Sequence, residues 1–241
     1  MPLTKLILFS GSAAVLALLL AGPESHAAFF TYQFSGQVTE VDNPNGFFTD
    51  VAAVGAPVSG AFTYTDSPNG SPFSLNPNFT NYTHQESPPD TGIVLIFNDI
   101  EAHASEFSLT NMIVGNDNLD DFFPPFFPPG DSFRYGDSLD GTSALFDFSQ
   151  AEFFQFANAG LFLADSSSEA FDSQDLPSGL PLSAFDGRYG LVDIYDDNFE
   201  ATGKLVFQID SIRAVPEPST YVLATIGLFG MASVIRQRKR R

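Results

Sequence analysis

Two short acidic segments carry the side chains best suited to bind a metal ion. Residues 116–121 read NDNLDD and residues 193–198 read DIYDDN. Their carboxylate and amide oxygens are the hard donors that calcium takes six to eight at a time. Neither segment fits the EF-hand loop, because Asn116 stands where its first Asp should be and Asp121 replaces its glycine. The alternative is a solvated, turn-forming charge run, and the weak calcium candidates are Asp117, Asp120, Asp121, Asp193, Asp196 and Asp197.

A single serine stands in a sequence that could present a nucleophile. Residues 135–141 read YGDSLDG, and their Gly-Asp-Ser-Leu resembles the nucleophile block of the GDSL esterases, which implies Ser138 as the nucleophile. That family takes its base from an Asp-x-x-His late in the chain, whereas His84 and His103 lie upstream of Ser138. A serine hydroxyl without a base is not activated. An Asp-Ser turn between two strands explains the same residues, so we expect no enzyme activity.

The histidines and the many acids indicate no further site. We expect His84 in a loop and His103 on a strand edge, without the three or four closely spaced ligands of a zinc site. Paired carboxylates could hydrolyse glycosides, but with so many acids some pair reaches the required separation by chance. The chain also has no tryptophan, the usual platform for sugar rings, although tyrosine or phenylalanine can replace it.

Both ends of the chain predict export. Lys5 precedes the apolar stretch 6–21 and then Ser-His-Ala, the order of a secretory signal peptide cleaved after Ala27. Residues 221–235 form an uncharged apolar run, and as a helix at about 1.5 Å per residue they span about 22 Å. Preceding residues and snorkelling arginines make up part of the roughly 30 Å of a bilayer core. The basic residues that then hold the end in the cytoplasm are Arg236, Arg238, Lys239, Arg240 and Arg241.

The last 27 residues resemble the PEP-CTERM sorting signal of Gram-negative bacteria. Val-Pro-Glu-Pro-Ser-Thr at 215–220 is followed by the apolar run and by the Arg-rich end. Pro216, Glu217 and Pro218 match the motif of that signal, and the residues from Arg236 onward match its stop element. The resemblance implies recognition by an exosortase and an association with envelopes, exopolysaccharide and biofilm. The two prolines also favour an extended segment that a protease can bind.

One extracytoplasmic domain is expected between these ends. We assign residues 1–27 to the signal peptide, 28–213 to the domain and 214–241 to the sorting signal, which includes a transmembrane helix. Of the 29 acidic residues only Glu24 and Glu217 fall outside the domain, which leaves 27 against four basic residues. This charge repels nucleic acid and anionic lipid. The chain has no cysteine, so neither a disulfide framework nor a thiol nucleophile is available.

The domain is predicted to be an all-β antiparallel β-sandwich of about eight to ten strands. Residues 29–41 and 57–65 alternate apolar and polar side chains, which is the period of a half-buried strand. Their similar sequences indicate an antiparallel pair with bulges at Gly36 and Gly60. The prolines of residues 121–130 require a loop, which either docks a partner or covers the core with its phenylalanines. Further strands are expected at residues 92–97, 106–114, 143–148, 153–164, 189–195 and 203–212.

These features predict a secreted, exosortase-processed protein with a structural or adhesive role linked to exopolysaccharide or biofilm. The alternatives are a carbohydrate-binding module, with or without calcium, and a GDSL-like hydrolase. The expected partners are signal peptidase and exosortase, an exopolysaccharide, and the inner membrane while an anchored intermediate exists. The expected destination is the outer cell surface or the extracellular matrix, and no resident cofactor other than calcium is expected.

Overall fold

The structure, a computed structural model, describes residues 28–76, 78–84, 92–105, 110–118, 130–149, 151 and 155–216. These residues form β-strands and one 3-10 turn, η1 (Asp50–Ala52), without any α-helix, and none of them lies in a helix able to cross a membrane. The predicted signal peptide and C-terminal helix lie outside the described residues. The strands are β1 (Phe29–Asp42), β2 (Pro57–Thr65), β3 (Phe73–Asn76), β4 (Phe79–His84), β5 (Gly92–Phe97), β6 (Ile100–His103), β7 (Thr110–Asn118), β8 (Gly130–Leu139), β9 (Phe156–Asp165), β10 (Gly187–Tyr195) and β11 (Ala201–Val215).

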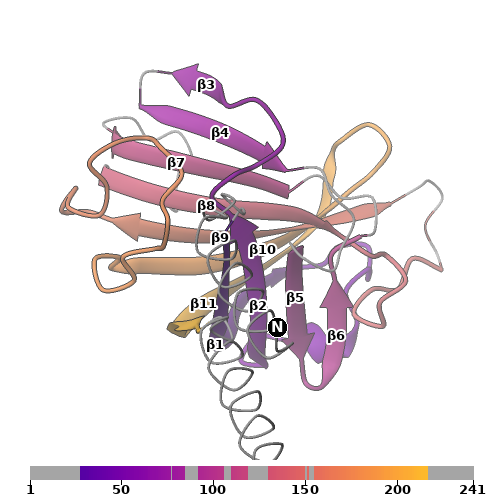
Figure 1. The fold of residues 1–241 in the computed structure, drawn as a ribbon. Helices are drawn as coiled ribbons and strands as arrows, with labels where there is room; N and C mark the ends of the chain where they lie inside the picture. Colours follow the sequence, from indigo (N-terminus) through magenta and orange to yellow (C-terminus); the bar gives the residue numbers. More distant parts are fainter. Residues whose placement is uncertain are drawn as a thin grey trace, which may run out of the picture.

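All these strands join one sheet in which every neighbouring pair is antiparallel. The order is β3-β4-β7-β8-β9-β10-β11-β1-β2-β5-β6. The first strand, β1, therefore pairs with the last, β11, near the middle of the sheet. In Figure 1 the strands β2, β5 and β6 run across the direction of β7, β8 and β9. The prediction of an all-β antiparallel fold is confirmed.

The sheet curls until its two halves face each other. Four strands separate β2 from β8 in the sheet order, yet the rings of Phe62 and Tyr135 are 5.1 Å apart. The rings of Tyr64 and Phe133, on the same two strands, are 5.4 Å apart. One continuous eleven-stranded sheet thus supplies the two facing layers, whereas we expected two separate sheets with about eight to ten strands.

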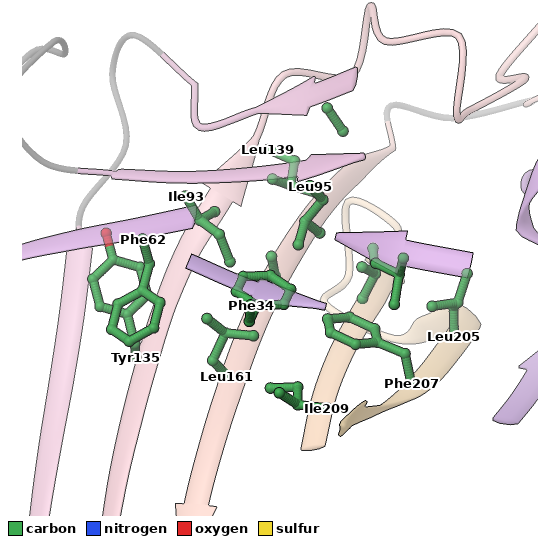
Figure 2. Packing of buried hydrophobic residues seen from close by; sticks show 14 of the residues in the cluster. Phe34, Phe62, Ile93, Leu95, Tyr135, Leu139, Leu161, Leu205, Phe207 and Ile209 are labelled. Atoms are coloured by element: carbon green, nitrogen blue, oxygen red, sulfur yellow. The ribbon is translucent and has the colours of Figure 1, made fainter. Parts of the chain in front are cut away.

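The core lies inside this curl. Figure 2 shows Phe34, Leu95, Leu161 and Phe207 pointing into the same interior from four different strands. All four side chains are buried. Full burial of one such side chain contributes about 1.5–3 kcal/mol relative to exposure. In a chain without cysteine, this burial of aromatic and aliphatic side chains is the main stabilising contribution.

A long connection closes one end of the core. Residues 166–186 join β9 to β10, and we call them the strap because they contact β1, β2, β4 and β8. Its Leu180 and Phe185 belong to the core cluster. Three tyrosine hydroxyls bond its backbone: the Tyr32 hydroxyl accepts from Leu180 N (2.7 Å), and those of Tyr64 and Tyr82 donate to Pro177 O (3.0 Å) and Gln174 O (2.9 Å).

Two buried aspartates anchor the beginning of the strap. Asp131 and Asp165 are cross-strand partners on β8 and β9. Asp131 accepts the amide of Phe171 at 2.7 Å, and Asp165 accepts those of Ser167 at 2.9 Å and Glu169 at 2.8 Å. Burial acts to raise the pKa of Asp165, but the hydrogen bonds from Ser167 and Glu169 outweigh it and hold that pKa below its usual value.

Phenylalanines close the other end of the core. Phe48 and Phe146 form an isolated β-bridge, and Asp147 N donates to Phe47 O at 2.8 Å. The ring of Phe148 packs against those of Phe47 and Phe146, at 5.6 and 5.4 Å. The predicted strand at 143–148 is therefore wrong. These residues form turns whose aromatic side chains cap the core, and their apolar pattern reflects that burial rather than a strand.

Most other predicted strands are found. Residues 29–41 and 57–65 form the antiparallel pair β1 and β2, and residues 92–97 form β5. The predicted strands at 106–114, 153–164, 189–195 and 203–212 correspond to β7, β9, β10 and β11 with shifted bounds. The sequence analysis missed β3, β4, β6 and β8. β8 reads GDSFRYGDSL, and its Gly, Asp and Ser residues are typical of turns.

One of the two predicted bulges is confirmed. The pairing of β1 with β11 shifts register at Gly36, whereas both ladders of β2 run through Gly60 without a shift. Glycine is needed at position 60 for space instead. A Cβ there would lie 2.7 Å from Cζ of Phe34 and would also overlap the carbonyl oxygen of Val94.

Candidate functional site

The end of β11 is the point at which the folded body meets the C-terminal segment. Its ladder with β1 extends from the pair Asp42 and Lys204 to the pair Thr31 and Val215. Pro216 follows directly, is exposed and lies outside the strand. Proline cannot donate to a β ladder, so the residue that opens the predicted motif also ends the strand. No spacer separates the body from the motif.

The beginning of the body lies beside this junction. Ala28 N donates to Asp66 Oδ1 at 3.1 Å, and Phe29 opens the ladder between β1 and β2. Because β1 and β11 are antiparallel neighbours, the start of β1 and the end of β11 lie at the same end of the sheet. The predicted cleavage residue Ala27 lies outside the described residues, as do Glu217, Pro218, Arg236, Arg238, Lys239, Arg240 and Arg241.

The segment at this junction matches a known family. Residues 214–240 match the PEP-CTERM protein-sorting motif. The chain is a PEP-CTERM domain protein. The motif indicates exosortase-dependent sorting to the cell surface, with export and a membrane-anchored sorting intermediate. No curated protein and no solved structure matches the chain.

The GDSL-like block of this PEP-CTERM protein forms the end of β8 rather than a turn. Asp137 and Ser138 are successive strand residues, so their side chains point to opposite faces of the sheet. Asp137 is buried, and the hydroxyl of Thr110 donates to it at 3.3 Å. The Ser138 hydroxyl donates to the amide oxygen of Asn158 at 2.9 Å. A neutral amide cannot act as the base that a serine nucleophile needs.

The two histidines of the body lie on different strands. His84 ends β4 and is buried, and its Nδ1 accepts the amide of Asn69 at 3.3 Å. The expected loop position of His84 is therefore wrong. His103 ends the edge strand β6 as expected, and its Nε2 lies 3.0 Å from Oε2 of Glu101, with both side chains exposed.

The calcium candidates are placed in two different parts of the fold. Asp117, the second-last residue of β7, has a φ of 50° and donates its amide to Asp131 at 2.9 Å. Asp196 caps the turn between β10 and β11, and Asp197 accepts from the Asn198 side chain at 3.1 Å. Asp120 and Asp121 lie outside the described residues. Within the described ranges, no group of three or more His, Asp or Glu side chains is arranged to hold a metal ion.

A polar network on the outer face of the sheet was missed by the sequence analysis. The Arg134 guanidinium lies over the ring of Phe162, 5.1 Å from its centroid. Burial lowers the pKa of Arg134 and raises that of the nearby Asp193. The Tyr195 hydroxyl donates to Asp193 at 3.1 Å, and burial together with this carboxylate raises the pKa of Tyr195 to about 12. Asp193, a calcium candidate, is thus already engaged with Tyr195.

An open groove of about 610 Å³ crosses the outer face of β11, β1, β2 and β5. Hydroxyl groups line it, and those of Ser35 and Ser211 are 2.7 Å apart. At one side Arg213 donates to the Gln33 side chain at 3.0 Å, and Val94 and other apolar side chains complete the lining. The groove therefore combines a mainly apolar lining with a few hydrogen-bonding side chains.

Proposed function

We propose that this protein is a non-enzymatic structural or adhesive component of the outer surface or extracellular matrix. The observation that carries the proposal is the direct connection of the sorting motif to β11, which pairs with β1 and β10 in the middle of the sheet. A folded body joined in this way is delivered as one unit when the motif is processed. The many acids keep such a body soluble, and the proposal requires neither a catalytic residue nor a cofactor.

Processing in the native host tests this proposal. Protein recovered from the surface should have an intact mass that lacks residues 1–27 and the tail beyond Pro216–Pro218. Replacing both prolines with alanine should leave the tail in place and the protein in the inner membrane. Asp210→Asn, an exposed change in β11, is the matched control. A mature surface protein that keeps its apolar tail would contradict exosortase processing.

The role after sorting needs a separate measurement. A strain that lacks the protein should lose matrix cohesion or surface attachment, and the wild-type gene should restore it. Restoration by a form that is retained in the inner membrane would argue against a role at the surface.

A carbohydrate-binding module is the second candidate function. Two separate surface features favour it: the exposed ring of Phe199, which offers an apolar face to a sugar ring, and the groove, whose serine hydroxyls can hydrogen-bond to a sugar. Polysaccharide extracted from the same cells should retain the purified protein on a column. If a chelator in the buffer abolishes retention, binding depends on calcium. No retention with or without the chelator would remove this candidate.

A further inference from the structure

The turn between β10 and β11 holds a phenylalanine in the solvent. Phe199 is 77% exposed, and its φ of 61° lies in the left-handed region that bulky residues rarely adopt. The amide of Phe199 donates to Asp196 O at 3.0 Å, and the Asp196 carboxylate accepts the amides of Asn198 and Glu200 at 2.9 Å each. These bonds maintain the conformation that presents the ring. An unfavourable backbone conformation that exposes an apolar ring points to a contact made by that ring.

Two further rings extend this surface. Phe156 and Tyr195 are cross-strand partners on β9 and β10, and their rings stack with centroids 5.5 Å apart at 23°. The Phe199 ring meets that of Phe156 edge to face, at 5.5 Å and 70°. We call Phe156, Tyr195 and Phe199 the aromatic platform.

Carboxylates are concentrated in the turn that carries Phe199, whereas the Arg134 guanidinium lies near Tyr195 and Asp193 on the sheet. Residues 193–200 contain Asp193, Asp196, Asp197 and Glu200 and no basic residue. The last three are partly or fully exposed, and Lys204, the first basic residue after them, is paired with Glu40 at 2.6 Å. Exposed rings beside carboxylates favour a ligand that combines an apolar face with positive charge.

The aromatic platform lies far from the membrane junction. Phe199 lies two residues before the start of β11, and the match to the sorting motif begins at Ala214, near the end of that strand. Fifteen strand residues at about 3.3 Å each extend about 50 Å. The aromatic platform and the start of the sorting motif therefore lie at opposite ends of β11.

We propose that the aromatic platform binds a polysaccharide that contains amino sugars with free ammonium groups. A sugar ring packs its C–H face on Phe199, and its ammonium group lies near the carboxylates of Asp197 and Glu200. Neutral polysaccharides lack the electrostatic contribution to binding, and the carboxylates repel anionic polysaccharides. The inference rests on the second candidate function and names its site and its ligand class.

Binding of chitosan oligosaccharide to the full-length protein, measured by calorimetry, tests the inference. Phe199→Gly removes the ring and suits the positive φ, so it should keep the fold and weaken binding at least tenfold. Phe73→Ala, which removes another exposed phenylalanine (62%) on β3, is the matched control and should leave the affinity unchanged. Glu200→Gln should weaken binding several-fold and reduce its dependence on salt. Equal melting temperatures confirm that the variants fold.

Four results of the binding measurements would overturn the inference. They are no binding of chitosan, binding that Phe199→Gly leaves unchanged, equal affinity for the fully N-acetylated oligosaccharide, and equal affinity for polylysine. Self-association that depends on Phe199, measured by sedimentation, would assign the platform to a second copy of the chain and would also overturn it. Sorting and surface retention of Phe199→Gly should stay normal, so failure here is distinguishable from failure of the proposed surface role.

Discussion

Thr31 and Val215 are cross-strand partners, the last pair of the ladder that joins the first strand of the body to its last. Translocation delivers β1 first and β11 last, so this ladder forms only after nearly the whole body has been exported. The same ladder ends one residue before Pro216 and includes Ala214 and Val215, the first two residues that match the sorting motif. The pair that completes the fold and the exposed processing site therefore lie next to each other in the chain.

Insertions on the two sides of this junction should have opposite effects. Six Gly and Ser residues between Val215 and Pro216 lie beyond the last ladder pair and should leave the melting temperature within about 2 °C of the parent. One residue inserted after Gln208 should abolish cooperative unfolding, because a shift of one residue turns the following side chains to the wrong face. Circular dichroism melts measure both. A large loss of stability from the junction insertion would show that the body extends beyond Val215.

Replacing either of two glycines on the sheet with alanine should change the free energy of unfolding by different amounts. A Cβ at Gly190 would overlap the buried Phe207 ring, so Gly190→Ala should lower the free energy of unfolding by about 1–3 kcal/mol or more. A Cβ at Gly136 on β8 would meet its nearest atom at 3.7 Å, an ordinary contact, and Gly136→Ala should cost less than about 1 kcal/mol. Urea titration of both variants measures the difference. Equal losses would mean that the Phe207 ring moves aside easily.

The strap should depend more on the buried hydroxyl of Tyr32 than on that of Tyr82. In Tyr32→Phe the buried amide of Leu180 loses its acceptor, which should cost about 1–3 kcal/mol. Tyr82→Phe should cost less, because its partly exposed partner Gln174 O can bond water instead. Urea unfolding gives the two losses, and limited proteolysis should cut residues 166–186 first in Tyr32→Phe. Unchanged cleavage there would show that core packing alone holds the strap.

Acid should release the strap through Asp165. Its pKa in the folded protein is lower than in the unfolded chain, where an aspartate titrates near 3.9. Its contribution is therefore fully present above about pH 4 and is lost as the pH falls through the folded-state pKa. Asp165→Asn should lower the free energy of unfolding at pH 7. The difference in this free energy between variant and parent should become smaller below pH 4. The control Asp210→Asn should show no such pH dependence, and a constant difference for Asp165→Asn would contradict this account.

Local patterns predicted much of this protein correctly. The alternation in residues 29–41 and 57–65 predicted β1 and β2 because a strand shows its two faces to different surroundings, and these two strands are neighbours in the chain. The three-part C-terminal signal could be recognised because an enzyme and a membrane bind it as a linear segment, so its information is contained in consecutive residues.

The remaining features depend on contacts between residues far apart in the chain. The pairing of β1 with β11, the curl that brings Phe62 to Tyr135, and the strap bonded by Tyr32 leave no local pattern, since each partner alone looks like an ordinary strand or loop residue. β8 was missed because its turn-forming residues are held in a strand by neighbours on both sides. The aromatic platform arises in the same way. The strap returns the chain so that β9 and β10 pair and stack Phe156 on Tyr195, and the turn after β10 brings the Phe199 ring against Phe156.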